Sequence, residues 1–365
     1  MSEMSKADNL SAIAAKKKLS SNFLKKGISI ALFSGVMYGF YSSFLTLGMS
    51  KGVWADWYGE NTAGLSILVI TYLLGALGSA VNDTCSAVWA MLYATARGKI
   101  GDFFRCLKTK PGGVMILAAL IGGPIASTAY VVGLQMAGSI VIPITALCPA
   151  IGAILGRVLF KQELNKRMML GIAICVLSSF MIGSTSIGGD APEGMFLGIC
   201  IAFIAALGWG FEGCVAGYGT SMIDSEIGIT IRQATSGLSN LIILVPIFGI
   251  VFGGSVGFSG NLVRQAFTSG PAMICFAVSG LCAFVSYMCW YNGNSMCGAA
   301  LGMACNGTYS FWGPFCCWIV LGVFAKMDGW ALPPIAWISA ILMIFGILTI
   351  AMNPMDLFRK KGDVK

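Results

Sequence analysis

The short stretch YGFYSS (residues 38–43) returns 171 residues later as WGFEGC (residues 209–214). Each copy places an aromatic residue, a glycine and a phenylalanine in the same order, inside a long apolar run. The second copy has Glu212 where the first has Tyr41. The returning phrase predicts a chain of two related halves. It also sets a carboxylate in an apolar segment, where its presence needs an explanation.

The composition indicates that most of the chain lies in lipid. Of the 365 residues, 57% are hydrophobic and 10% are charged, and the mean hydropathy is +0.82. A water-soluble domain needs about a quarter of its residues charged to cover its surface. The apolar runs are continuous and do not alternate as membrane strands would. We therefore expect an all-α polytopic membrane protein.

Ten apolar runs are long enough to cross a bilayer as helices. They lie near 27–49, 64–94, 113–134, 139–160, 168–187, 194–218, 230–253, 271–293, 297–324 and 334–352. In chain order we expect a cytoplasmic N-terminal tail (1–26), a first five-helix repeat (27–187), a second five-helix repeat (188–352) and a cytoplasmic C-terminal tail (353–365).

The basic residues orient these spans. With ten spans, all but three of the 23 Lys and Arg residues fall on one side, and the exceptions are Lys51, Arg264 and Lys326. Because positive residues stay in the cytoplasm, both termini are expected on the cytoplasmic side. The expected location of the protein is the inner membrane of a bacterial cell. The net charge of +8 is explained by anionic lipid, so no nucleic-acid partner is expected.

Further matches keep their order along the chain. TAGLSILVITYLL (residues 62–74) is matched by TSGLSNLIILVPI (residues 235–247), and Gly133 and Gly138 are matched 160 residues later. Two halves with an odd number of spans each must have opposite orientations in the membrane. Inverted repeats suit alternating access, because each half can adopt the conformation of the other.

Residue types for several chemistries are missing. The chain has no His, and its thirteen Cys form no CxxC pair, so zinc binding is not expected. There is no Walker motif, and the GxGxxG letters of GWGFEG (residues 208–213) lie inside a span and follow no strand. We expect no metal, no cofactor and no enzyme activity, and an ion or substrate gradient as the energy source.

Two acidic residues fall inside the expected spans, Asp83 and Glu212. An ionisable group at bilayer depth is costly and tends to face a cavity or a partner. Asp83 could instead lie near the cytoplasmic interface, hydrated or paired with Arg, and Glu212 could pair structurally with another helix. Because no His is present, we expect Glu212 to carry coupling protons, with Asp83 in a lesser role.

Aromatic and amide side chains accompany these carboxylates. In the expected spans one, six, eight and nine they are spaced to share helix faces, although for each ring a place facing lipid is a comparable alternative. The candidate substrate-binding residues are Tyr38, Tyr41, Trp209, Glu212, Trp290, Asn306, Tyr309 and Trp312.

The segment ALCPAIGAILGRVLFKQELNKRMMLGIAICVLSSFMIGS (residues 146–184) has Pro149 within a span, Glu163 past its end and Gly171 in the next span. This arrangement resembles the EamA signature of the drug/metabolite transporter superfamily. The second half departs from it, with no equivalent Glu in AKMDGWALPP (residues 325–334).

The resemblance implies a ten-helix secondary transporter with a central cavity. Spans one, three, four, six, eight and nine would line the cavity, and spans five and ten would lie at the periphery, where relatives form homodimer contacts. A transporter of a small polar metabolite is therefore expected. A scaffold or sensor that kept the fold without transport is the alternative from another class.

The substrate class stays open at this level. An anionic substrate would need Lys or Arg in mid-span, and Arg232 is expected near a helix end. Carboxylates beside Tyr and Trp suit an organic cation, held by charge and cation–π contact. Trp and Asn side chains equally suit a neutral sugar, a nucleoside or an amino acid, with Glu212 then acting only as a proton carrier.

Overall fold

The computed structural model describes residues 2–59, 64–161, 165–184, 194–220, 222–297 and 299–351. Within these ranges every element is helical and no strand occurs. The first half contains α1 (Ser2–Gly48), α2 (Val53–Tyr58), η2 (Val69–Leu73), α3 (Leu74–Ala96), α4 (Ile100–Cys106), α5 (Lys110–Leu120), η3 (Ile121–Ser127), α6 (Thr128–Ala137), η4 (Gly138–Ile140), α7 (Val141–Thr145), α8 (Cys148–Phe160) and α9 (Lys166–Ser184).

The second half has the same character. It contains α10 (Met195–Thr220), α11 (Ser225–Ser239), η5 (Asn240–Leu244), α12 (Val245–Gly253), α13 (Val256–Thr268), α14 (Gly270–Cys297), α15 (Ala299–Asn306), α16 (Tyr309–Cys317), η6 (Trp318–Phe324) and α17 (Pro334–Ala351). Four of the elements labelled η (η2, η3, η5 and η6) are π-helical and continue an α-helix without a break.

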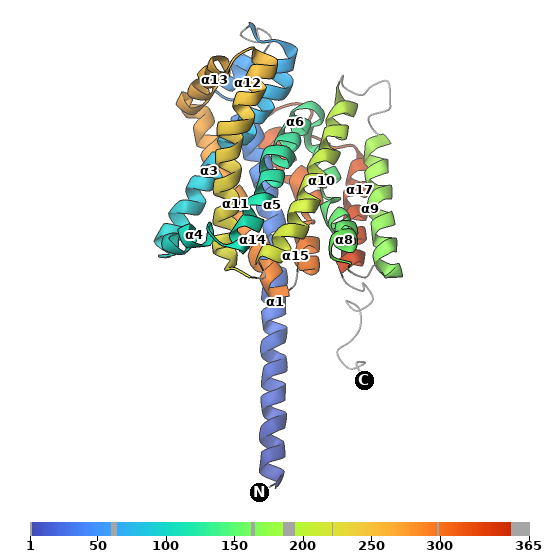
Figure 1. The fold of residues 1–365 in the computed structure, drawn as a ribbon. Coiled ribbons are helices and arrows are strands. Elements are labelled where there is room, and N and C mark those ends of the chain that lie inside the picture. Colours follow the sequence, from blue (N-terminus) through green and yellow to red (C-terminus); the bar gives the residue numbers. More distant parts are fainter. Residues whose placement is uncertain are drawn as a thin grey trace.

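These elements form one bundle of roughly aligned helices (Figure 1). Six helical segments in the described ranges are long and apolar enough to cross a membrane. They are Asn22–Gly48, Lys110–Thr145, Met195–Ala216, Ser225–Gly253, Gly270–Met296 and Gly302–Phe324, and two shorter apolar helices are Cys148–Leu159 and Pro334–Ile350. The protein is thus an all-α protein with several potential membrane spans, as the composition predicts.

Within the described residues, each of the ten expected ranges coincides with a helix or with a run of helical elements. The expected N-terminal tail is also helical, because α1 begins at Ser2 and projects beyond the bundle (Figure 1). The expected C-terminal tail at 353–365 lies outside the described residues. The number of helices that cross the membrane stays a prediction.

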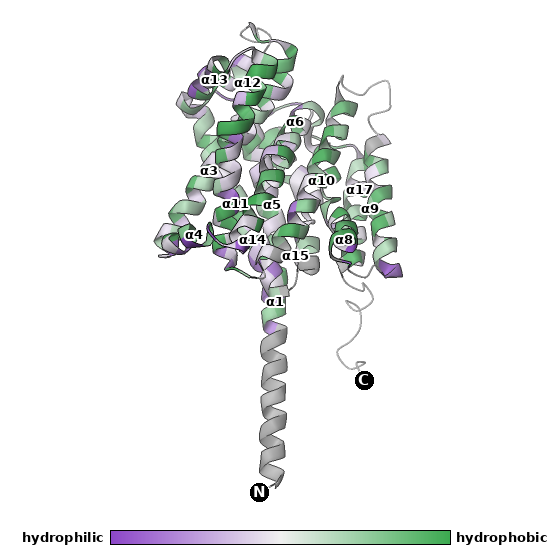
Figure 2. Cartoon of the chain, viewed as in Figure 1, coloured by the Kyte–Doolittle hydropathy of each residue, from purple (hydrophilic) through white to green (hydrophobic). Residues whose placement is uncertain are grey.

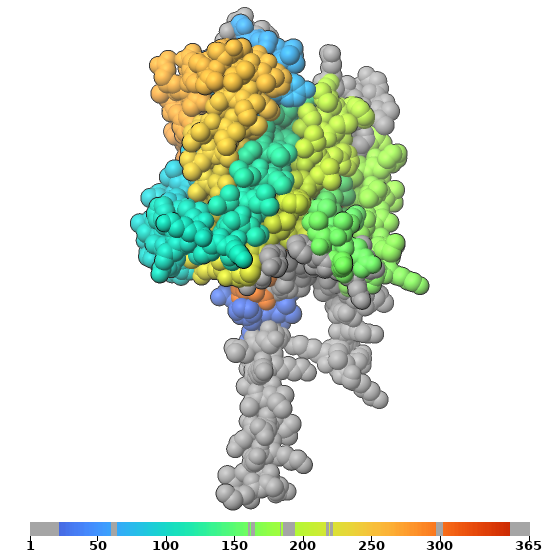
Figure 3. Space-filling model, viewed as in Figure 1, coloured from blue at the N-terminus to red at the C-terminus, as the bar shows by residue number. Residues whose placement is uncertain are grey.

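The outer face of the bundle is apolar. Figure 2 shows strongly hydrophobic residues along the visible sides of α10, α12 and α9, and Figure 3 shows these helices packed without a wide opening on that face. Large side chains such as Phe180 and Ile242 are exposed at 71% and 64%. Apolar side chains of this kind are stable in contact with lipid chains, which explains why so few charged residues lie on the surface of the protein.

Helices α9 and α17 pack against each other at one edge of the bundle (Figure 1). At Gly171 a side chain would approach the backbone of Gly346 within 2.7 Å. The lack of a side chain therefore permits this close approach. This peripheral pair corresponds to the expected spans five and ten.

The EamA-like segment is broken where the sequence suggested one helix. The expected fourth span divides into α7 and α8, and Pro149 lies in the first turn of α8, not in a helix interior. Proline is favoured there because its missing N–H would have no helical partner. Glu163, the acidic residue of the resemblance, lies outside the described residues.

The repeat is only partly reflected in local structure. Gly64 precedes η2 with a φ of +72°, whereas its sequence match Gly237 lies inside α11, against the backbone of Asp83. The two glycines therefore occupy different structural positions. The first residues of the two copies of the repeated phrase, in contrast, lie together. Tyr38 of α1 and Trp209 of α10 meet at the centre of the bundle, with ring centroids 6.0 Å apart.

Ion pairs join two loops at one end of the bundle. The Lys99 Nζ, after α3, lies 2.9 Å from Asp224 and 2.8 Å from Glu226 at the start of α11. Although burial opposes it, hydrogen bonds from Lys99 and from the Glu226 backbone N–H lower the pKa of Asp224. Asp224 also caps α11, because its carboxylate accepts that N–H at 2.8 Å.

Candidate functional site

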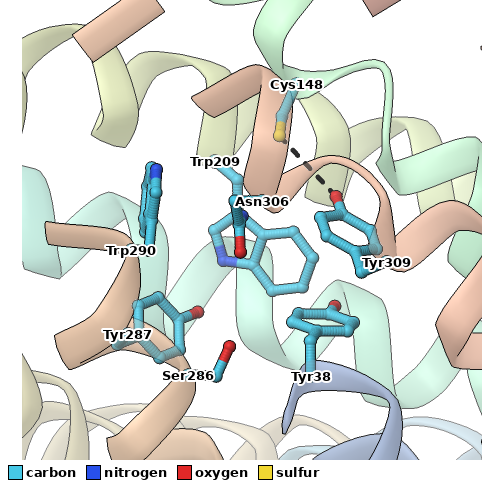
Figure 4. A pocket seen from close by; sticks show the side chains of 8 residues that line it. All are labelled: Tyr38, Cys148, Trp209, Ser286, Tyr287, Trp290, Asn306 and Tyr309. Carbon is cyan, nitrogen blue, oxygen red and sulfur yellow. Dashed lines mark hydrogen bonds between the residues drawn. The ribbon is translucent and has the colours of Figure 1, made fainter. Parts of the chain in front are cut away.

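A cavity ringed by aromatic side chains lies at the centre of the bundle (Figure 4). Its lining comes from six helices: Tyr38 of α1, Cys148 of α8, Trp209 of α10, Ser286, Tyr287 and Trp290 of α14, Asn306 of α15 and Tyr309 of α16. None of these eight described residues is charged. The cavity is narrow in this conformation, at about 20 Å³, which is room for about one water molecule.

The rings are packed in pairs. Tyr38 stacks on Tyr309 with centroids 4.2 Å apart and meets Trp209 edge-on. In Figure 4, Tyr287 and Trp290 lie on the opposite side from Tyr38 and Tyr309, with Trp209 between them in this view. A small ligand at the centre would therefore meet π faces from several directions once the helices move apart to admit it.

A few polar atoms interrupt the aromatic lining. The Asn306 Oδ1, at the end of α15, accepts a hydrogen bond from the Ser34 hydroxyl at 2.7 Å, which supplies the partner that a buried amide needs. The Tyr309 hydroxyl lies 3.6 Å from the Cys148 Sγ. The buried Nε1 of Trp290 has no hydrogen-bond partner among the described residues. This indole N–H is therefore available to an acceptor oxygen of a ligand or to water.

The π-helical segment η3 positions Trp209. Pro124 interrupts the hydrogen bonding of this segment, and the Gly122 carbonyl accepts a hydrogen bond from the Trp209 Nε1 at 3.1 Å. Gly122 also makes room for α10, because a side chain there would lie within 1.8 Å of the Glu212 Oε2. The π-turn and the glycine together bring α10 against η3, as π-bulges do at many functional sites.

The structure brings together five of the eight predicted binding residues, Tyr38, Trp209, Trp290, Asn306 and Tyr309.

The other three predicted residues do not line the cavity. Tyr41 is buried behind the lining, with its ring 5.3 Å from that of Tyr38. Trp312 packs against Phe311 and Phe315 on α16. The third, Glu212, lies in an ion pair.

Glu212 forms a buried ion pair with Arg232 of α11. The Arg232 Nε lies 2.7 Å from Oε1, and its Nη2 lies 3.2 Å from Oε2, so the contact is bidentate. Both side chains are 0% exposed. The same guanidinium donates to the Tyr287 hydroxyl at 2.9 Å and lies 3.9 Å from the centroid of that ring. The structural alternative for Glu212, pairing with another helix, is thus realised.

The expectation that Arg232 lies near a helix end was wrong. The sequence placed the start of the seventh span near residue 230, but α11 begins at Ser225 because Asp224 caps it. Arg232 therefore lies two turns inside the helix and points into the core. An arginine inside the bundle is compatible with the uncharged cavity because Glu212 balances its charge.

Asp83 of α3 is also buried, with 4% exposure, so the alternative of a hydrated carboxylate at the interface does not apply. Its nearest polar neighbours are neutral. The Ser236 hydroxyl donates to it at 2.5 Å, the Asn240 amide at 2.9 Å, and the Asn82 amide at 3.4 Å. The two carboxylates singled out in the sequence therefore have different surroundings.

Several site residues were not predicted from the sequence. Ser286 and Tyr287 precede Trp290 on the same face of α14 and could have been found from their helical spacing. Cys148 could not, because a lone cysteine in an apolar segment is usually core filler. Tyr130 of α6, with its ring 5.2 Å from that of Trp209, supports the cavity from behind. The expected lining spans are thus represented, with span three in a supporting place.

No protein-family model matches the chain. It is 22% identical over 233 residues to "Protein LicB" of Haemophilus influenzae (strain ATCC 51907 / DSM 11121 / KW20 / Rd), which covers 64% of this chain and 73% of that protein. A solved structure described as "Crystal structure of protein" matches with a TM-score of 0.53 and 15% identity, over 88% of this chain and 96% of the other. At that identity the likeness concerns the fold alone.

Proposed function

We propose that this protein is a secondary transporter of the drug/metabolite type that moves a small organic cation across the membrane by alternating access. The observation that supports this most directly is the uncharged cavity of Tyr and Trp rings at the centre of the bundle. Rings of this kind attract a cation through their π faces, by about 2 kcal/mol for a desolvated contact.

The charges behind the lining fit the same substrate. Two carboxylates and one guanidinium are the buried acidic and basic side chains of the described residues. With all three ionised, the core carries one unit of negative charge. A monovalent cation in the cavity would balance it, whereas an anion would be repelled. Arg232 gives no support to anion binding because Glu212 occupies its guanidinium.

The small volume of the cavity agrees with transport better than with permanent storage of a ligand. Room for about one water molecule means that substrate entry requires movement of helices around the stacked Tyr38 and Tyr309. The Trp290 N–H, for which the described part of the chain offers no hydrogen-bond partner, suggests a substrate that also carries an acceptor oxygen. The ten-span topology, the inverted repeat, both termini in the cytoplasm and a homodimer through α9 and α17 belong to the same proposal.

The alternatives are separated by a ligand screen on the purified protein. Thermal stability is measured against amines of increasing methylation, neutral sugars, nucleosides and amino acids, with the Tyr309→Ala variant as control. We expect cations to raise the melting temperature of the wild type and to raise that of the variant less. Stabilisation by neutral compounds alone would favour the neutral-substrate alternative, because the cavity lining is uncharged.

A flux measurement then separates a transporter from a scaffold or sensor. Proteoliposomes are loaded with the best-binding cation, and exchange against labelled cation outside is followed over time. A transporter exchanges label faster than empty liposomes do. Binding without exchange would overturn the transport proposal and leave the sensor.

A further inference from the structure

Among the described residues, no cationic side chain forms a hydrogen bond with the Asp83 carboxylate. Arg232 is the buried basic residue of the core, and its Nε and Nη2 contact Glu212 while its Nη1 donates to Gln233 at 2.8 Å. An isolated buried carboxylate costs several kcal/mol unless it is compensated. Asp83 is compensated by dipoles, not by an opposite charge.

The groups around Asp83 can serve either protonation state. Hydroxyls both donate and accept hydrogen bonds, and an amide donates through nitrogen and accepts through oxygen. The Asn240 Nδ2 now faces Asp83, while its buried Oδ1 has no hydrogen-bond partner among the described residues. Rotation of this amide would turn Oδ1 toward a protonated Asp83, in exchange for the hydrogen bonds that Nδ2 now donates to Asp83 at 2.9 Å and to the Ser79 hydroxyl at 3.4 Å.

Four other ionisable side chains, each from a different helix, interact electrostatically with Asp83. They are Arg232 of α11, Glu212 of α10, Tyr41 of α1 and Tyr287 of α14. The Glu212–Arg232 pair contributes little net charge, and the tyrosines are neutral. The proton occupancy of Asp83 therefore decides whether the core has a charge of minus one or zero.

We propose that Asp83, with Asn82, Ser236 and Asn240, forms a proton-binding site separate from the aromatic cavity. The proton bound at Asp83 removes the charge that attracts a cation into the cavity, so the proton and the organic cation compete. This coupling rests on the proposed transport function, whereas the proton site itself does not.

The Glu212–Arg232 pair has a different task in this proposal. Its guanidinium fixes Tyr287, which lines the cavity, so the pair positions the site and carries no coupling proton. A sodium ion is a poorer occupant than a proton beside Asp83. It would need several oxygen lone pairs, and the three groups that surround the carboxylate now direct hydrogens toward it.

The test is infrared difference spectroscopy on the purified protein between acid and alkaline pH, without substrate. A buried carboxyl that binds a proton gives a carbonyl band that water-exposed acids do not share. We expect this band in the wild type, its loss in Asp83→Asn, and its retention in the paired variant Glu212→Gln/Arg232→Met. A band lost in the paired variant and kept in Asp83→Asn would overturn the proposal, as would a wild type without such a band.

A second variant covers the case in which Asp83→Asn does not fold. Ser236→Ala keeps the carboxyl and removes one hydrogen bond to it, so the carbonyl band should persist at a shifted frequency. An unchanged frequency would place the protonated group elsewhere. A band that disappears on adding sodium chloride, but not on adding potassium chloride of equal ionic strength, would identify a sodium site and reject the proton site. Because no substrate is used, failure of this test is distinct from failure of the transport proposal.

Discussion

Glu212 and Asp83 are two buried carboxylates of one helix bundle, yet their surroundings differ. Glu212 accepts two hydrogen bonds from the guanidinium of Arg232, whereas Asp83 accepts its bonds from a serine and two amides. A cationic side chain therefore contacts the first carboxylate, whereas neutral donors surround the second. Burial alone therefore does not say which carboxylate would bind a proton in the transport that we propose.

The largest effect is expected from breaking the buried pair on one side. Arg232→Met leaves Glu212 buried without its cation, and loss of one partner of such a pair costs about 3–5 kcal/mol. The paired variant Glu212→Gln/Arg232→Met should recover most of this loss, because it removes both charges. The melting temperatures of the detergent-purified variants measure both the loss of stability and its recovery. Equal melting temperatures for the single and paired variants would show that Glu212 does not depend on Arg232.

A smaller loss of stability is expected from Gly122→Ala. The added methyl would lie 1.8 Å from the Glu212 Oε2, so the Glu212 carboxylate must move within its contact with Arg232, and overpacking of this kind costs about 1–3 kcal/mol. Gly113→Ala is the matched control, since no atom lies within 4 Å of a side chain there. If the two variants melt alike, the close approach of Gly122 to the Glu212 side chain does not contribute to stability.

Binding should separate the residues that line the cavity from those that do not. Tyr309→Ala removes a stacked ring, and loss of about 1.4 kcal/mol weakens binding of a cation roughly tenfold. Asn306→Ala should act in the same direction, while Trp312→Ala should leave affinity unchanged because Trp312 packs outside the cavity. Titration of each folded variant with the cation that stabilises the wild type measures this. Equal losses of affinity in all three variants would show that Trp312 also contributes to the binding site.

The smallest effect is expected at the exposed end of the bundle. Lys99→Met removes ion pairs to Asp224 and Glu226, and pairs of this exposure contribute up to about 1 kcal/mol. A hydrogen bond to Glu226 raises the pKa of Lys99, so its contribution persists through neutral pH and is lost only as pH rises through that raised value. The lowered pKa of Asp224 means that its contribution is lost as pH falls through it.

Near neutral pH, therefore, added salt and not pH should weaken the Lys99 contacts. Melting of wild type and Lys99→Met at low and high ionic strength measures the difference. A gap that stays constant with salt would show that Lys99 acts by packing.

Much of the fold could be read from the sequence, because lipid imposes a simple rule. The described residues of every expected span are largely helical, since long apolar runs have few alternatives in a bilayer. The break at residues 146 and 147 could not be predicted, because the hydropathy of the segment does not change where α7 ends. The early start of α11 was also missed, although Asp224 before Ser225 is a recognisable cap.

The candidate site could be predicted in part. Tyr38 and Trp209 were found through the repeated phrase, and their rings do meet. Trp312 was misplaced because helical spacing alone does not say which face of a helix points inward. The pairing of Glu212 with Arg232 depends on where α11 begins and on the space that Gly122 leaves, and a linear pattern contains neither.

In the proposed transporter, Asp83 and not Glu212 carries the charge that couples cation transport to pH. The most direct measurement is exchange of labelled cation in proteoliposomes across a range of pH, with wild type, Asp83→Asn and Glu212→Gln/Arg232→Met compared. We expect the pH dependence to vanish in Asp83→Asn and to survive in the paired variant. A pH profile that survives in Asp83→Asn and vanishes in the paired variant would contradict the claim.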